Sequence, residues 1–245
     1  MMVPSTLEDA IAQAKEAVQA ALDNGCGRIV VDLAIPEIAL QAQAIALQFT
    51  AMFADYGEGL RVMFPDSGAA ALAKRDWGET EFQTTDLGSR FTPVDKKIAD
   101  SDRIFLLVCP SSVEIESVEK LCNLAGDRPV ILLIPQLESV ATVGIGYAAR
   151  QLRERFLSTL ETAYFLKPFE GGAIYRFYPS LWQVLLEENG EWQLIAEEPV
   201  KPAGDRLERI LMETTETEEN QDSAPKLKQA GFLGSLQKIF KALGQ

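Results

Sequence analysis

The chain has 245 residues, of which 47% are hydrophobic, enough apolar material for the core of one large domain or two small ones. Its formal charge of −13 and its sequence pI near 4.6 argue against non-specific nucleic-acid binding, because a phosphate backbone requires a cationic surface. The sequence contains no histidine, which excludes a Ser-His-Asp triad, a Cys-His catalytic pair and the common zinc sites.

The first part of the chain alternates between helical and strand patterns. Ser5 and Glu8 have the spacing of a capping box, and apolar residues then recur at helical spacing through the next turns. Residues 29–33 form a short apolar run that is typical of a buried strand. A second helical pattern covers residues 38–52, so the sequence predicts helix, strand and helix in that order.

The same alternation continues through the middle of the chain. Three further apolar runs predict buried strands, at residues 60–64, 104–108 and 130–134. Asp66 or Ser67 is expected to cap the helix after the first of them, because both side chains can accept a hydrogen bond from a free amide. Ser111 and Glu114 predict a second capping box after the next strand.

The last part of the chain changes from helical to strand periodicity. A helical pattern follows Gly144, and a short helix is expected at 205–212. Between them lie four short strand patterns, at residues 163–166, 174–178, 181–187 and 192–197. Asn189-Gly190 predicts a tight hairpin between the last two. The sequence therefore predicts an α/β fold, a three-layer and mainly parallel doubly wound sheet with an antiparallel C-terminal hairpin extension.

The cysteines and the N-terminus bear on the location of the protein. Cys26, Cys109 and Cys122 have no CxxC spacing, so we expect free thiols and a reducing compartment. The opening MMVPSTLEDA has neither signal-peptide nor transit-peptide features. The densest apolar runs are about a third of the roughly 18 residues that a spanning helix needs. We therefore expect a cytoplasmic protein that does not cross a bilayer.

Four of the predicted strands run directly into a proline: Pro36, Pro65, Pro110 and Pro135. All four prolines are expected at the carboxyl edge of the sheet, where open α/β sheets bind ligands. One interpretation is that they only punctuate the loops, since proline ends strand pairing. The other is a ligand crevice, for which Ser67, Ser111, Ser112 and Gln136 would supply hydrogen-bond partners, with Arg150 beside them.

Motifs for nucleotides are absent. The chain has neither a G-x-x-x-x-G-K-[ST] loop nor a G-x-G-x-x-G after its first strand, so no cofactor is expected. Gly144 and Gly146 lie at a predicted helix start whose amides could hold an anion, with Arg150 about one turn further along, although a glycine pair near a helix start is usually just a turn. The neighbouring carboxylates Asp100/Asp102 and Glu187/Glu188 are expected to be solvated.

The C-terminus differs from the rest of the chain. We expect a single α/β domain over residues 1–212, an acidic flexible linker over 213–225 and a basic amphipathic helix over 226–245. The residues expected to bind a membrane or a partner are Phe232, Leu233, Leu236, Lys238, Ile239, Phe240 and Lys241. The apolar stripe needs a cover, which the domain itself, the groove of another protein or anionic lipid headgroups could provide.

Four separated segments together carry a resemblance. They are residues 3–10 (VPSTLEDA), 143–156, 163–168 (AYFLKP) and 174–182 (IYRFYPSLW). In this order they resemble an uncharacterised domain family of cyanobacteria and chloroplasts. Plant relatives in that family include a Low Photosystem II Accumulation assembly factor and the non-kinase part of a plastid adenylate-kinase-like protein. The absence of transit-peptide features favours a cyanobacterial source.

The resemblance implies a function and a partner but no site residues. It implies a non-enzymatic accessory protein that binds a photosystem II subunit or assembly intermediate, peripheral to the thylakoid membrane. The alternative is an α/β domain, with or without enzymatic activity, that binds a nucleotide, a phosphorylated metabolite or a pigment precursor at the carboxyl edge of the sheet.

Overall fold

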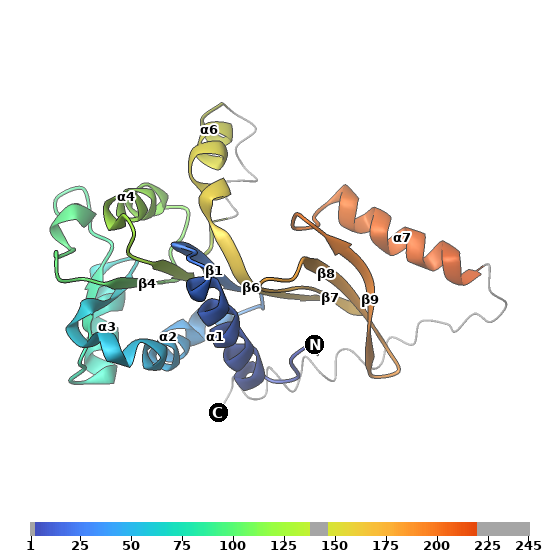
Figure 1. The fold of residues 1–245 in the computed structure, drawn as a ribbon, viewed down its shortest axis with the longest axis horizontal. Helices are drawn as coiled ribbons and strands as arrows, with labels where there is room; N and C mark the ends of the chain where they lie inside the picture. The colour runs from blue at the N-terminus through green and yellow to red at the C-terminus, as the bar shows by residue number, and fades with distance from the viewer. Residues whose placement is uncertain (1–2, 138–146, 220–245) are drawn as a thin grey trace.

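The computed structural model describes residues 3–137 and 147–219, which contain a nine-stranded sheet with helices on both faces (Figure 1). The strands are β1 (Arg28–Leu33), β2 (Leu60–Phe64), β3 (Gln83–Asp86), β4 (Ile104–Val108), β5 (Val130–Leu133), β6 (Glu161–Phe169), β7 (Gly172–Phe177), β8 (Trp182–Glu188) and β9 (Glu191–Glu198). The helices are α1 (Leu7–Asp23), α2 (Ala42–Thr50), α3 (Ser67–Trp77), α4 (Ile115–Ala125), α6 (Tyr147–Arg155) and α7 (Asp205–Glu219). Short 3-10 helices are η1 (Ile38–Gln41), η2 (Ala51–Gly59), η3 (Val94–Lys96) and η4 (Leu157–Thr159).

The strand order across the sheet is β3-β2-β4-β5-β1-β6-β7-β8-β9. The first six strands in this order are parallel to their neighbours, whereas β6, β7, β8 and β9 pair antiparallel. The predicted fold class is confirmed, including the antiparallel C-terminal extension. We use "parallel part" for β1 to β5 with α1 to α6, and "extension" for β7 to β9 with α7.

Helices cover both faces of the parallel part, which gives it three layers (Figure 1). The apolar faces of α1, α2 and α3 pack on one side of the sheet, and those of α4 and α6 pack on the other. The connection after β2 leads through α3 to β3, whereas the connection after β4 leads through α4 in the opposite direction, to β5. The carboxyl ends of β2 and β4 are therefore the topological switch point, where a ligand crevice is expected.

The first helix joins the two parts of the molecule. An alanine-rich stripe on α1 is fully buried and lets the helix lie close to β1, β6 and β7. The Oε1 atom of Gln13 accepts hydrogen bonds from the hydroxyls of Tyr164 on β6 and Tyr175 on β7, at 3.1 and 2.9 Å. The helix cap is Thr6, whose hydroxyl accepts from the Asp9 amide at 3.0 Å. The predicted capping box therefore lay one residue too early.

The extension is a meander closed by the predicted hairpin. Asn189 and Gly190 both have positive φ, 53° and 85°, as a two-residue type I′ turn requires. On the face toward α7, Trp182 is buried and packs on Phe165 with ring centroids 5.1 Å apart. Leu207 of α7 covers this small cluster.

Helix α7 extends beyond its expected end. It runs through Glu219, so the first seven residues of the predicted linker, 213–219, are helical. Glutamate is a good helix former, and the Thr214 hydroxyl donates to the carbonyl of Ile210, which satisfies a polar group in the exposed turn. The predicted basic helix 226–245 and its seven binding residues lie outside the described residues, so the domain boundaries stay a prediction. Within residues 3–137 and 147–219, no helix has the length and apolar content needed to span a bilayer.

Candidate functional site

The carboxyl edge of β4 and β5 is held by backbone contacts. Cys109 and Ile134, each followed by proline, have positive φ of 50° and 52°. The Cys109 amide donates to Leu133 at 2.8 Å, and the Gln136 amide then donates to Pro110, also at 2.8 Å, beside a backbone bridge between Ser111 and Gln136. A β-branched residue such as Ile134 rarely adopts positive φ, so the backbone here is strained. The loops after β4 and β5 thus close on each other.

The turn before α4 is held by the carboxylate of Glu114. The Oε2 atom of Glu114 accepts from the amide of Ser111 at 2.9 Å and from its hydroxyl at 2.7 Å. The predicted Ser111–Glu114 contact therefore forms. The regular helix begins only at Ile115, because residues 112–114 form a separate turn in which the Val113 amide donates to the Ser111 hydroxyl.

The free amides at the start of α3 are capped by a carboxylate. Asp66 is the cap, and its Oδ1 accepts from the amides of Gly68 and Ala69 at 2.7 and 2.9 Å. Ser67 is the first residue of the helix, with an exposed side chain. At the switch point, the start of α3 thus carries a carboxylate on its free amides, and the turn before α4 holds a second carboxylate, an arrangement that repels an anionic ligand.

The structure brings together only part of the predicted ligand site. Ser111 and Gln136 are bridged, and Ser112 lies half-buried in the turn beside them. Arg150 is exposed on α6, and in the part of the chain that the structure describes no hydrogen bond joins it to these residues. Gly144 and Gly146, the predicted anion site, lie outside the described residues.

The thiols near the sheet are poor nucleophiles. Burial raises the pKa of Cys109 to about 11, and the negative charge of Asp32 adds to this shift. Burial also raises the pKa of Cys122, on the buried face of α4, to about 11. Since the thiolate is the reactive form, both sulfurs are protonated and unreactive near neutral pH. All three cysteines are free, as the sequence predicted.

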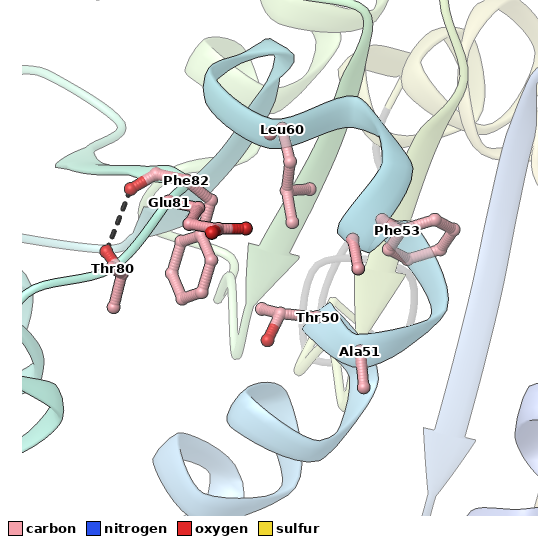
Figure 2. A pocket seen from close by; sticks show the side chains of 9 residues that line it. Thr50, Ala51, Phe53, Leu60, Thr80, Glu81 and Phe82 are labelled. Carbon is pink, nitrogen blue, oxygen red and sulfur yellow. Dashed lines mark hydrogen bonds between the residues drawn. The ribbon is translucent and has the colours of Figure 1, made fainter.

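A hollow lies at the opposite, amino edge of the sheet. It has a volume of about 250 Å³, and Figure 2 shows its lining, which includes Thr50, Phe53, Leu60, Glu81 and Phe82. The Thr50 hydroxyl already donates to the carbonyl of Leu47 at 2.7 Å. The hollow therefore offers mainly apolar contacts and lies away from the switch point.

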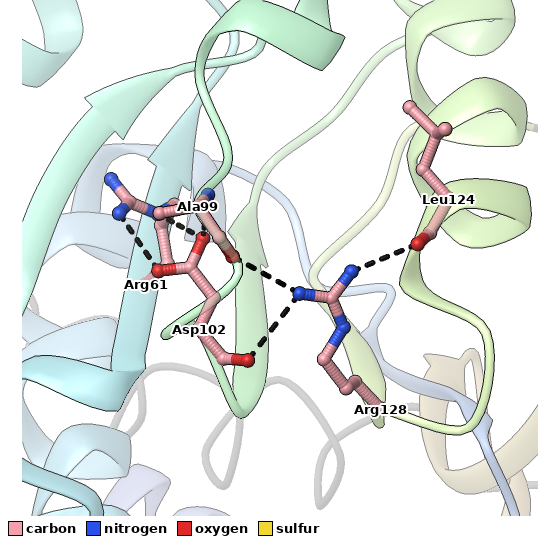
Figure 3. Close-up of polar contacts among 5 residues, drawn as sticks. All are labelled: Arg61, Ala99, Asp102, Leu124 and Arg128. Carbon is pink, nitrogen blue, oxygen red and sulfur yellow. Dashed lines mark hydrogen bonds and ion pairs between the residues drawn. The ribbon is translucent and has the colours of Figure 1, made fainter.

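A buried charge network also lies at the amino edge (Figure 3). The guanidinium of Arg61 makes two hydrogen bonds of 2.6 and 2.7 Å to the carboxylate of Asp102, which is 0% exposed and also accepts from the Ala99 amide. Beside it, Arg128 donates to the carbonyls of Leu124 and Ala99. The expectation that Asp102 is solvated was wrong, because a charged residue inside strand β2 needed a buried partner. The network joins β2, β4 and α4, and its role is structural.

Two apolar side chains are exposed on loops at the carboxyl edge. Phe91, after β3, is 81% exposed with the Arg90 guanidinium 4.5 Å from its ring centroid, and Val113, after β4, is 84% exposed. The loop that carries Phe91 is ordered by the Ser89 hydroxyl, which accepts from the amides of Phe91 and Thr92. Nothing in the hydrophobic pattern of the sequence indicated that these side chains stay exposed.

Residues 4–209 match the family described as Domain of unknown function (DUF1995). The chain belongs to the DUF1995 family. The predicted resemblance to an uncharacterised domain family is thereby confirmed at this level.

The DUF1995 match covers all nine strands of the sheet and the first turn of α7. The carboxyl edge, the buried Arg61–Asp102 pair and the extension all belong to the DUF1995 domain, whereas residues 210–245 follow the matched region. The matched region thus contains the sheet, its loops and the helices that pack on the parallel part.

Proposed function

We propose that this DUF1995 protein is a non-enzymatic accessory protein that binds a photosystem II subunit or assembly intermediate at the periphery of the thylakoid membrane. The link to photosystem II rests on the resemblance of segments 3–10, 143–156, 163–168 and 174–182 to plant relatives that include a Low Photosystem II Accumulation assembly factor. Family membership supports the resemblance without specifying the partner.

One observation carries the binding role. At the switch point, where this fold class holds small ligands, the carboxylate of Asp66 accepts from two amides at the start of α3, and that of Glu114 accepts from the Ser111 amide in the turn before α4. On neighbouring loops, Phe91 and Val113 are more than four-fifths exposed. These polar groups are already hydrogen-bonded within the chain, and exposed apolar side chains lie on loops beside them. Such a surface suits a protein as the binding partner better than a phosphorylated metabolite.

The C-terminal segment supports a peripheral location. Residues 226–245 contain four lysines and no acidic residue, and their apolar residues recur at helical spacing. An anionic lipid surface would bind both features at once. Leu236→Glu should then reduce flotation of the full chain with anionic vesicles, whereas unchanged flotation would contradict the tether.

Partner binding can be tested with solubilised photosynthetic membranes. The full chain should capture photosystem II subunits, identified by mass spectrometry, and the Phe91→Ser and Val113→Ser variants should each capture about tenfold less, as a loss of about 1.4 kcal/mol requires. Val200→Ser is the matched control, because Val200 is 72% exposed but follows β9. Capture of these subunits by neither the full chain nor its variants would refute the proposal.

The alternative, a ligand site at the carboxyl edge, is favoured by the strained backbone at Cys109 and Ile134, because such strain clusters at functional sites. A thermal-shift screen with nucleotides, phosphosugars and pigment precursors tests it, since a ligand that binds only the native state raises the unfolding temperature. A shift that disappears in Ser111→Ala would favour the alternative, and no shift with the whole panel would count against it.

A further inference from the structure

The two edges of the sheet differ in length and cover. At one end, β3 has four residues, all polar, and short polar edges resist pairing with other chains. At the other end, β9 has eight residues, most of them exposed or half-buried. Within residues 3–137 and 147–219, β9 pairs with β8 alone.

The backbone of β9 presents hydrogen-bonding groups outward at defined residues. Glu188 and Glu191 flank the two-residue turn and form its hydrogen-bonded pair, so the next pair, Glu187 with Trp192, is non-hydrogen-bonded. Consistent with this, the Glu187 amide donates away from β9, to Gly171 at 2.9 Å. The main-chain groups of Trp192, and of Leu194 two residues on, therefore point away from β8.

From β8 onward, the extension is also more acidic than the chain before it. Residues 182–219 contain eleven acidic and three basic residues, a net charge of −8, whereas residues 1–181 have 24 acidic and 16 basic residues and reach −8 over a far longer stretch. On β9 itself, Glu191, Glu197 and Glu198 flank the apolar centre. A segment that binds here is therefore favoured if it is cationic.

One carboxylate at this edge has an unsatisfied oxygen. The Oε2 atom of Glu187 is buried and has no hydrogen-bond partner in the part of the chain that the structure describes. Glu187 lies directly opposite Trp192 and on the same face of the sheet. A Lys or Arg side chain that crossed the indole of Trp192 would lie over an aromatic face and close to the Glu187 carboxylate. Leu194, 50% exposed, would contact the neighbouring apolar residue.

We propose that β9 is a docking edge for an extended cationic segment of a partner protein, which pairs with the outward groups of Trp192 and Leu194 as a tenth strand. A second copy of this chain fits poorly, because two β9 strands would bring their glutamates together. The inference rests on the proposed function only in that the partner is a protein.

The test uses the purified full chain and a fluorescein-labelled peptide of eight residues, the length of β9, in which valine alternates with lysine or arginine. We expect binding with a Kd in the range of about 10–100 µM that weakens with salt, and added hydrogen-exchange protection of the Trp192 and Leu194 amides. The same peptide with glutamate in place of each basic residue should not bind. Because no photosynthetic component is present, this result is independent of the capture experiment.

Two variants separate backbone pairing from side-chain contact. Leu194→Pro removes an outward amide and should weaken peptide binding at least about tenfold, whereas Leu194→Ala keeps the amide and should weaken it less than about threefold. Glu187→Gln, which does not depend on the folding of a proline variant, should weaken binding of the basic peptide about tenfold.

Several outcomes overturn the proposal. They are no binding up to about 1 mM peptide, equal binding of the acidic peptide, and equal affinities of all three variants and the wild type. Protection of the Trp192 and Leu194 amides in the free chain would also overturn it, because the edge would then be covered by the chain itself or by a second copy, which the molar mass in solution distinguishes.

Discussion

The parallel part and the extension share one sheet, but they differ in how their polar groups are buried and hydrogen-bonded. In the parallel part, β4 and β5 are buried along their whole length, and the charged Arg61 on β2 meets a buried carboxylate with two hydrogen bonds. In the extension, β9 is largely exposed. Both buried side-chain polar atoms that lack a partner within the described residues, Arg176 Nε and Glu187 Oε2, belong to β7 and β8.

This difference indicates a division of labour within the domain. A fully satisfied, doubly covered sheet is suited to stability, since every unpaired buried polar group would cost free energy. An edge strand whose outward main-chain groups have no partner within the described residues is suited to recruiting another chain. The parallel part is therefore the scaffold, and the extension is the better place for contacts with another chain.

The largest expected effect tests the scaffold. Asp102→Ala leaves the Arg61 guanidinium, 14% exposed, without its partner, and should lower the free energy of unfolding by about 3–5 kcal/mol. Urea denaturation followed by circular dichroism measures it. Arg155→Ala is the control, because Arg155 pairs with Glu119 at the surface with its side chain 56% exposed and should cost less than about 1 kcal/mol. Equal losses of unfolding free energy in the two variants would show that the buried Arg61–Asp102 pair stabilises the fold no more than a surface ion pair does.

A second pair of variants tests whether the extension has a core of its own. Trp182, 5% exposed, fills the cluster under α7, so Trp182→Ala should cost about 3 kcal/mol. Trp192→Ala, on the half-buried opposite face, should cost about 1 kcal/mol. Chemical denaturation gives both values. A Trp192→Ala loss as large as that of Trp182→Ala would mean that β9 is a structural strand rather than a free edge.

A further expected effect is an alkaline one, located in the parallel part. The pKa of Cys122 is raised from 9.0 to about 11 by burial, so the folded state holds this proton more tightly than the unfolded state. The stabilisation is complete below pH 9.0 and is lost as the pH rises to about 11, by at most about 1.4 kcal/mol per pH unit. Unfolding free energies measured across this window should fall less steeply in Cys122→Ala. Equal slopes of unfolding free energy against pH in the wild type and in Cys122→Ala would contradict the assignment of this loss to Cys122.

Apolar periodicity was sufficient to predict most of the sheet, but not its edges. The buried strands β4 and β5 are continuous runs of apolar residues, and β1 and β2 are mostly apolar, so their type and order could be predicted. Strand β3, with the sequence QTTD, was missed because its pairing with β2 comes from tertiary context and not from apolar residues. The helix predicted over 38–52 is divided, since Glu37 has positive φ and 3-10 turns flank α2.

The candidate site was less predictable than the fold. Parallel topology correctly brought Ser111 and Gln136 to one edge. The Ser111 hydroxyl is available to a ligand only if the nearby Glu114 carboxylate does not accept its hydrogen bond. The capping-box spacing of Ser111 and Glu114 in the sequence already indicated this contact. The burial of Asp102 and the exposure of Phe91 depend on contacts between distant segments, which periodicity does not contain.

The placement of α1 has a consequence for how the protein is made. This helix precedes all nine strands of the sheet along the chain, yet its Gln13 bonds to Tyr164 and Tyr175 join residues 151 and 162 positions apart. At ribosomal speed, the buried stripe of α1 waits about 10–30 s for the strands that cover it. A nascent chain that ends before β6 leaves that stripe open to water. Chaperone demand should therefore be greatest during translation and end when β7 emerges.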